Sequence, residues 1–296
     1  MIKITLRNSI VFLAILLVGS WAIWSKITAQ STQVQLAVAA NFQKPIYDLV
    51  NLYNEQYPGA LNLTVNIGAT GNFLKEIETA GVGNSPYDLF LAANTAAPIE
   101  LKTGGYAPVA DNVTNYANGQ LALYANDPGG LIVGPDTTTA VNLLTAHTFA
   151  GQLVVADTVN APYGAAAKEV LSDPAINVDR QYVLPNGDMN TANVDVEPDI
   201  GAAYSKVASG GASFPAGFIA LSEICGSAPS TKSWIVDQSY YDPLTQAAIV
   251  LSSRHGAAST AGAEAFLSWL MTDPDAQNII ITDYCYSIPS NSKNKK

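Results

Sequence analysis

Residues 34–42 read VQLAVAANF, and this stretch decides the fold because the chain repeats its pattern. The six residues VQLAVA have the apolar, β-branched composition of a buried strand, and apolar side chains then recur at helical spacing from Phe42 to Tyr53. The same order returns in residues 61–80 and again in residues 88–103. Strand–helix–strand repeats of this length predict a parallel sheet with helices on both faces.

The remaining chain continues the α/β alternation. Residues 121–124, 152–156, 217–220 and 244–251 are predicted strands, and residues 163–171, 200–208, 260–271 and 273–283 are predicted helices. Residues 173–198 contain Pro174, Pro185 and Pro198 and are predicted to be irregular. The sequence therefore belongs to the α/β class.

The composition of the chain excludes several classes of protein. Its 296 residues suffice for one large domain or two lobes, each with its own core. Apolar residues make up 48 % and charged residues only 13 %, which excludes intrinsic disorder. Lys+Arg 14 against Asp+Glu 24 gives a net charge of −10, which opposes nucleic-acid binding because phosphate affinity needs a basic face.

The N-terminus has the three parts of a secretory signal peptide. Lys3 and Arg7 precede an almost uncharged apolar run over residues 9–24, and Ala29 supplies a small residue at the expected cleavage site. Residues 1–29 are therefore predicted to direct export and to be removed; the alternative is a membrane anchor that is retained. At the other end, residues 291–296 are predicted to form a disordered basic tail.

The cysteines and histidines are too few for the common metal centres. Cys225 and Cys285 lie too far apart for a CxxC motif, and His147 and His255 are the only histidines. In an oxidising compartment the two cysteines are predicted to form one disulfide, with two separate buried thiols as the alternative. The chain also lacks the nucleophile elbow, the His-Glu-x-x-His motif and the P-loop, so the sequence shows no catalytic constellation.

Anion chemistry is indicated where predicted strands end and helices begin. Small or hydroxyl residues open the helices in three segments: residues 39–42 (AANF), 68–72 (GATGN) and 160–164 (NAPYG). A helix N-terminus presents unpaired N–H groups, and small side chains let an anion approach them. The alternative is ordinary helix capping by Asn41, Thr70 and Asn72.

The ordered set of motifs resembles the periplasmic molybdate/tungstate-binding protein family, the receptors of ABC importers. The matching pieces, in family order between residues 34 and 288, are LAVAANF (36–42), IGATGNF (67–73), PYDLFLAAN (86–94), NAPYGAAA (160–167), IGAAYSKVASG (200–210), GFIAL (217–221) and YYDPLTQAAIV (240–250). Each piece is weak alone, being mostly alanine and glycine, and the ordered set is strong.

The resemblance implies a two-lobed periplasmic-binding-protein fold of type II. Each lobe would hold a mixed sheet flanked by helices, and the ligand cleft would lie between the lobes. Lobe I would comprise residues 30–117 and 236–290, and lobe II residues 118–235. The ligand would be molybdate or tungstate, without any cofactor or separate protein-bound metal, and the partner would be the membrane permease of an ABC importer. A periplasmic monomer is expected.

The resemblance also carries over a set of oxyanion-binding positions. These are Ala40, Asn41, Ala69, Thr70, Tyr163 and Ile200, of which Ala40, Ala69 and Ile200 would act through the backbone. Ala220 departs from the pattern, because other relatives carry a ligand-binding tyrosine there. The stretch 186–199 is also longer than in most relatives.

Two other functions remain open at this point. The same fold could bind sulfate, phosphate or a small carboxylate. The chain could instead be a secreted hydrolase, which would need a nucleophile paired with a base. With only two histidines, a lysine or carboxylate base would be required.

Overall fold

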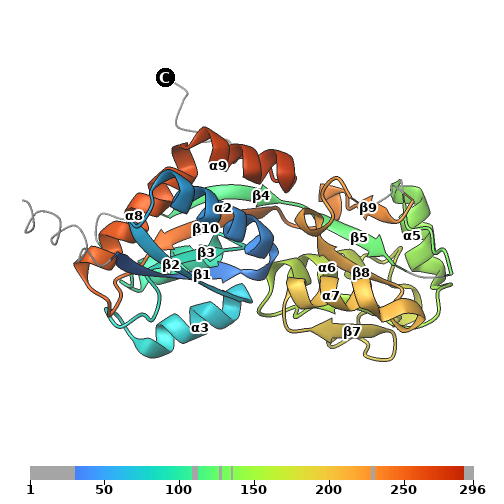
Figure 1. Ribbon diagram of the computed structural model, residues 1–296. Helices are drawn as coiled ribbons and strands as arrows, with labels where there is room; N and C mark the ends of the chain where they lie inside the picture. The colour runs from blue at the N-terminus through green and yellow to red at the C-terminus, as the bar shows by residue number, and fades with distance from the viewer. Residues whose placement is uncertain (1–30, 109–112, 127–128, 135, 228–230, 290–296) are drawn as a thin grey trace, which may run out of the picture.

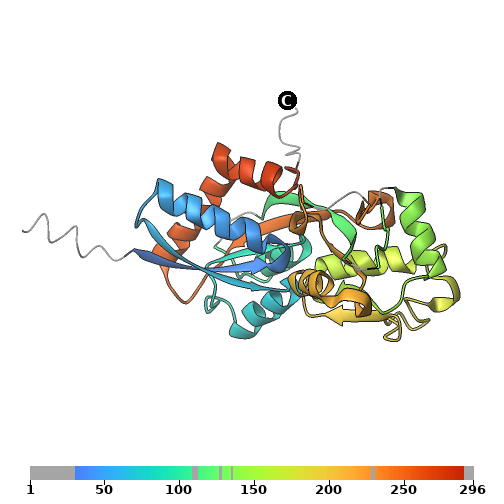
Figure 2. The ribbon, with the colours of Figure 1, turned by 45° about the vertical axis from the view of Figure 1, so that its right-hand side comes forward.

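The computed structural model describes residues 31–108, 113–126, 129–134, 136–227 and 231–289. The predicted signal peptide and the predicted basic tail both lie outside these described residues. Two five-stranded sheets, each with its own helices, form two halves that lie side by side in both views (Figures 1 and 2).

The first sheet is mixed, with the strand order β2-β1-β3-β10-β4. Its strands are β1 (Thr32–Ala39), β2 (Leu61–Gly68), β3 (Leu89–Ala92), β4 (Thr114–Gly119) and β10 (Leu244–Val250). β1 pairs in parallel with β2 and β3, as the strand–helix repeats predict. β10 pairs antiparallel with β3 and β4, so the parallel pairing predicted from the repeats does not extend to these strands, and the sheet is mixed, as the family resemblance implies. The repeats describe only the N-terminal strands, whereas β10 arrives from the other half in the opposite direction.

Helices cover both faces of the first sheet. They are α2 (Gln43–Gln56), α3 (Thr70–Ala80), α4 (Ala96–Thr103), α8 (Ala257–Thr272) and α9 (Pro274–Asn278), with a single 3₁₀ turn η1 (Ala40–Phe42) before α2 and a π turn η6 (Ile279–Asp283) after α9. Because side chains alternate along β1, Leu36 and Val38 join the core beneath α2 and α8. Ala37 joins the core beneath α3 and α4.

The second sheet has the strand order β7-β6-β8-β5-β9. Its strands are β5 (Leu121–Ala125), β6 (Leu153–Ala156), β7 (Val194–Glu197), β8 (Ala216–Ala220) and β9 (Ser233–Ile235), and its helices are α5 (Thr137–Ala146), α6 (Pro162–Ser172) and α7 (Ile200–Gly210). Short 3₁₀ turns are η2 (Val178–Arg180), η3 (Gly211–Ser213), η4 (Leu221–Glu223) and η5 (Gln238–Tyr240). Strand β6 is parallel to β7 and β8, and β5 is antiparallel to β8 and β9.

Sequence patterns miss four elements: β4, β7, β9 and α5. β7 lies inside the stretch predicted to be irregular. Its sequence VDVE is not recognised as a strand because it puts two carboxylates on an edge strand. Those carboxylates, Asp195 and Glu197, are paired with Lys206 of α7 at 2.7 Å and 2.6 Å. Ion pairs with the next helix in the chain therefore accompany a strand that local apolar content does not reveal.

The chain passes between the halves twice. At the first crossing, β4 ends at Gly119 and β5 begins at Leu121, so the linker between these two strands is the single residue Gln120. The return runs through residues 236–243, between β9 and β10. β4 thus extends two residues past position 117, where the sequence places the end of lobe I. Across the described part of the chain, every helix is too short or too polar to span a bilayer.

Candidate functional site

A small pocket lies between the two halves. From the first half it is lined by Ala39, Ala40, Asn41, Gly68, Ala69, Thr70 and Ala93, and from the second by Ala161, Pro162, Tyr163, Asp199 and Ile200. All six predicted oxyanion-binding residues line this pocket. The cavity volume is about 10 Å³, close to the ~10–15 Å³ that a cavity needs in order to hold one water. A small ion fits such a space better than a peptide does.

The parallel strands explain why these residues meet. The carboxyl ends of β1, β2 and β3 lie at the same edge of the first sheet, where η1 and α3 begin. In the second half, α6 and α7 begin opposite them, since Ala161 and Ile200 line the same pocket. Ligands of open α/β sheets gather outside the carboxyl ends of the strands.

Three of the four helix starts have no side-chain cap. The N-cap residues of η1, α3 and α6 are Ala39, Ala69 and Ala161, whose methyl groups cannot accept a hydrogen bond. The interpretation of Asn41, Thr70 and Asn72 as ordinary capping residues is therefore wrong, because the cap positions precede them. The uncapped N–H groups favour an acceptor that enters the pocket.

Thr70 is positioned as a hydrogen-bond donor. Its side chain is buried, and its Oγ1 accepts a hydrogen bond from the Ala93 N–H at 3.0 Å. The hydroxyl proton is then left for another acceptor, since a hydroxyl carries one donor and two acceptor sites.

The side chain of Asn41 is buried in the protein's own hydrogen-bond network. Its Nδ2 donates to Gln246 Oε1 and to the Tyr286 hydroxyl, both at 2.9 Å. Its Oδ1 is buried with no partner among the described residues. A buried acceptor left unpaired costs about 1–3 kcal/mol of stability, so a hydrogen-bond donor that enters the pocket and reaches this oxygen would be favoured.

Tyr163 reaches the same network from α6. Its hydroxyl accepts a hydrogen bond from Gln246 Nε2 at 3.2 Å. Burial and the neighbouring Tyr286 raise the pKa of Tyr163 well above its ordinary value, so the phenol stays neutral. Gly119 makes room for the hydroxyl, because a Cβ at that position would overlap it.

The pocket is almost free of formal charge. Of the described residues that line it, Asp199 alone is charged, and its carboxylate caps α7 by accepting from the Ala202 N–H at 2.9 Å. Sequence reasoning missed Asp199, although an aspartate before a helical pattern is an ordinary N-cap signal. Neutral donors thus define the chemistry of the pocket, which suits an anion that carries its own charge.

Several contacts join the halves around the pocket. The Gly71 N–H donates to the Asn160 carbonyl oxygen at 2.8 Å, and Lys75 Nζ donates to Asn160 Oδ1 at 2.8 Å. On the other side, Ser222 Oγ donates to the Asn41 carbonyl oxygen at 3.0 Å. The structure therefore describes a closed arrangement of the two halves.

An ion pair also links the halves. Lys44 Nζ on α2 lies 2.9 Å from Glu223 Oε2 on η4 and 4.7 Å from the centre of the Tyr204 ring on α7. The Glu223 side chain is only 5 % exposed. Burial raises the pKa of the Glu223 carboxyl above its ordinary value, and Lys44 acts in the opposite direction.

Replacing Lys44 with methionine is expected to lower the free energy of unfolding by about 1–3 kcal/mol at pH 7, because ionised Glu223 loses its partner. Without Lys44 the folded-state pKa of Glu223 rises further above its unfolded value. Stability is then lost as the pH rises through that pKa, and the deficit shrinks below it. Urea unfolding at pH 4 and pH 7 measures the difference. Lys168→Met is the control, since Lys168 forms no ion pair among the described residues. A deficit that is the same at both pH values would contradict the prediction.

A disulfide connects the two halves beside this interface. Cys225 and Cys285 are bonded, with Cα atoms 5.7 Å apart and a sequence separation of 60. Cys225 follows η4 of the second half, and Cys285 belongs to the C-terminal segment that packs on the first half. Tyr286, next to Cys285, donates to the Asn41 carbonyl oxygen at 2.8 Å.

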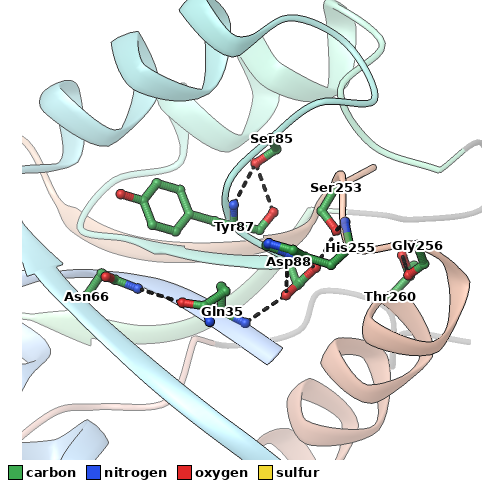
Figure 3. A network of polar contacts seen from close by, with 9 residues as sticks. All are labelled: Gln35, Asn66, Ser85, Tyr87, Asp88, Ser253, His255, Gly256 and Thr260. Carbon is green, nitrogen blue, oxygen red and sulfur yellow. Dashed lines mark hydrogen bonds and ion pairs between the residues drawn. The ribbon is translucent and has the colours of Figure 1, made fainter. Parts of the chain in front are cut away.

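Figure 3 shows a second polar cluster around Asp88, which directly precedes β3, whereas Ala93 of the pocket directly follows that strand. The buried Asp88 carboxylate accepts from the Gln35 N–H at 2.7 Å and from the Ser253 hydroxyl, and His255 Nδ1 lies 3.1 Å from it. The serine and the histidine ring both contact Asp88 instead of each other. A hydrolase triad needs the histidine between the acid and the serine, so this cluster anchors the loop after β10 and does not form a triad.

The other histidine has a structural environment. The ring of His147 packs edge-on against Phe149 and Tyr182, and burial lowers its pKa. Among the described residues, no group of three His, Cys, Asp or Glu side chains could hold a metal ion.

Comparison with known proteins assigns the family. A family model described as bacterial extracellular solute-binding protein matches residues 34–284. The chain belongs to this family. It is 33% identical over 254 residues to the molybdate-binding protein ModA of Rhodobacter capsulatus, covering 86% of this chain and 88% of that protein. It is also 33% identical over 226 residues to ModA of Azotobacter vinelandii, covering 76% and 79%.

Solved structures agree with the family assignment. The periplasmic molybdate-binding protein of Azotobacter vinelandii matches with a TM-score of 0.70 and 26% identity, over 86% of this chain and 99% of that one. The predicted fold class, two mixed sheets flanked by helices as in periplasmic binding proteins, is confirmed. The resemblance drawn from the sequence motifs is confirmed as well. These relatives are named as binding proteins, and the family is one of solute-binding proteins, not of enzymes.

Proposed function

We propose that this solute-binding protein captures molybdate or tungstate outside the cytoplasm and delivers it to the membrane permease of an ABC importer. The observation that carries the proposal is the pocket itself, where uncapped helix starts and neutral side chains surround a space for a small anion. The names of the curated relatives point to the same ligand.

The proposed donors come from both halves of the molecule. The first half would donate hydrogen bonds from the side chains of Asn41 and Thr70 and from the backbone near Ala40 and Ala69. The second half would donate them from the Tyr163 hydroxyl and from the backbone at Ile200. Hydrogen bonds to a charged group contribute roughly 1.5–3 kcal/mol each. Five such groups, with Asn41 and Tyr163 counted as one, already suffice to hold a dianion without any arginine or lysine. The net charge of −10 then affects the association rate more than the affinity.

The proposed function also implies two lobes that move relative to each other. Lobe I would comprise residues 30–117 with 236–290 and lobe II residues 118–235, hinged at the two connections between the sheets. Because ligand groups come from both lobes, binding should close the cleft and lower the radius of gyration. Small-angle scattering with and without molybdate measures this change.

Membership in an extracellular solute-binding family places the protein outside the cytoplasm. That residues 1–29 act as a cleaved signal peptide is part of the proposal, supported by their charged, apolar and small-residue order. A mature N-terminus near Gln30 is expected from N-terminal sequencing, and an intact Met1 would indicate an anchor. The functional unit is proposed to be a monomer, which sedimentation would establish.

Ligand identity is tested by calorimetric titration with molybdate, tungstate, sulfate and phosphate. Molybdate is expected to bind about a hundredfold more tightly than sulfate, because donors set for the longer metal–oxygen bonds leave two groups unpaired around a smaller ion, at roughly 1–3 kcal/mol each. If sulfate, phosphate or a small carboxylate bound more tightly than molybdate, the fold assignment would stand and the proposed ligand would be wrong.

Replacing Thr70 with valine is expected to weaken molybdate binding about 10- to 100-fold, since the change removes one charged-group hydrogen bond and little volume. It also removes the acceptor of the Ala93 N–H, so the free energy of unfolding should fall by about 1–3 kcal/mol while the protein still folds. The control is Thr79→Val, the same substitution on the exposed side of α3. Equal molybdate affinities for the parent and Thr70→Val would contradict the assignment of Thr70.

A further inference from the structure

Gln246 occupies the centre of a buried hydrogen-bond network that no sequence motif singled out. It lies on β10 and is fully buried, with Asn41 on one side and Tyr163 on the other. Its Oε1 accepts from Asn41 Nδ2 at 2.9 Å and from the Tyr116 hydroxyl at 2.8 Å. Its Nε2 donates to the Tyr163 hydroxyl at 3.2 Å. One amide therefore connects two of the six proposed ligand-binding residues.

This network has a second arrangement of the same shape. An amide turned by 180° exchanges its donor and its acceptor without moving its neighbours. If Asn41 and Gln246 both turn, Gln246 Nε2 donates to Asn41 Oδ1 and to the Tyr116 hydroxyl. The Tyr116 proton, no longer directed at Gln246, is donated to the Ala92 carbonyl oxygen, which lies 3.2 Å away. The Tyr286 hydroxyl, 2.9 Å from the Asn41 amide, becomes a donor to it and gives up its bond to the Asn41 carbonyl oxygen, to which Ser222 Oγ still donates at 3.0 Å.

Asn41 and Tyr163 both line the pocket, and the two arrangements differ in which of their groups are left for a ligand. In the first, the unpartnered Asn41 Oδ1 needs a donor, and the Tyr163 proton is not held by Gln246. In the second, Asn41 Nδ2 takes the place of that oxygen, and the Tyr163 proton is given to Gln246. If only Asn41 turned, its Oδ1 would face Gln246 Oε1 at 2.9 Å, two acceptors without a proton between them. The two amides must therefore turn together.

We propose that Gln246 determines which neutral group meets the oxyanion: it couples the Asn41 amide to the Tyr163 hydroxyl, so that one of them donates and not both. An oxyanion without protons selects the second arrangement, because it repels Oδ1 and is bonded by Nδ2. An oxyanion that carries a proton, such as hydrogen phosphate, can donate to Oδ1 and is compatible with the first. Gln246 is thus a specificity-determining residue that acts through Asn41. This inference rests on the proposed oxyanion-binding function.

A double-mutant cycle tests the coupling. Molybdate affinity is measured by calorimetry for the parent, Tyr163→Phe, Gln246→Met and the double variant. In the parent, Tyr163→Phe is expected to change affinity less than twofold, because the Tyr163 proton is held by Gln246. In the Gln246→Met background the freed hydroxyl donates to the anion, and Tyr163→Phe is expected to cost tenfold or more. Thr70→Val is the control, since Thr70 bonds Ala93 and should cost the same in both backgrounds.

A purely structural role for Gln246 would make the Tyr163→Phe cost equal in both backgrounds, and that result would overturn the inference. A tenfold cost already present in the parent would overturn it too. If Gln246→Met does not fold, the side-chain amide protons of Asn41 in the ¹⁵N-labelled parent give the second measurement. Their resonances should shift on molybdate binding, and unchanged resonances would overturn the coupling. Failure of the parent to bind any oxyanion is a separate result, which would overturn the proposed function itself.

Discussion

Replacing Gly71 with alanine is expected to weaken molybdate binding tenfold or more without destabilising the ligand-free protein. Gly71 lies in the first turn of α3, and its N–H bonds the Asn160 carbonyl oxygen across the cleft at 2.8 Å. An added Cβ would lie 2.9 Å from the Asn160 Cα, closer than such atoms approach. The closed arrangement must therefore shift, whereas an open cleft leaves space for the methyl group.

Alanine also separates binding from folding at this position. Within a helix, alanine is about 1 kcal/mol more favourable than glycine, so the unfolding midpoint of the ligand-free variant should stay or rise. The matched control is Gly201→Ala in the first turn of α7, where the added Cβ would meet its nearest atom, the Asp199 carboxylate oxygen, at 3.3 Å. Titration calorimetry measures molybdate affinity, and small-angle scattering measures the closure of the cleft. The prediction would be contradicted if Gly71→Ala matched the parent in both.

Removing the disulfide is expected to lower the free energy of unfolding by about 4 kcal/mol in the chain-entropy model, because the bond closes a loop of 60 residues. The double substitution Cys225→Ser with Cys285→Ser makes this change. The bond also holds the segment of Tyr286 against that of Ser222, and both hydroxyls donate to the Asn41 carbonyl oxygen. The loss should therefore include a weaker attachment of the C-terminal segment to the pocket.

Urea unfolding of the parent with and without dithiothreitol measures the effect of the disulfide. The reductant should bring the parent to the stability of the double variant and leave the double variant unchanged. Thiol titration of the denatured, unreduced parent should find no free groups. Two free thiols there, or a reductant effect of less than about 1 kcal/mol, would show that the bond does not stabilise the protein in this way.

The candidate site could be predicted from the sequence because its parts are local. A strand that ends in small residues and opens a helix is visible within ten residues, as in AANF and GATGN. Parallel strands then bring such segments to one edge of a sheet. Asp199 carries a local signal, but only that of an ordinary helix N-cap, and Gln246 carries none that points to the site. A single glutamine in the apolar strand LTQAAIV is an isolated signal, and its partners Asn41 and Tyr163 are 205 and 83 residues away.

By itself the sequence determined the α/β class, the family, and six of the twelve residues that line the pocket, since periodicity and short motifs are properties of neighbouring residues. Only the tertiary structure decided that β10 runs antiparallel to β3, that alanines occupy the cap positions, and that Gln246 joins Asn41 to Tyr163. These features depend on contacts between residues far apart in the chain. Local composition cannot specify such contacts, because the hydrogen bonds of a buried amide depend on which distant elements pack around it.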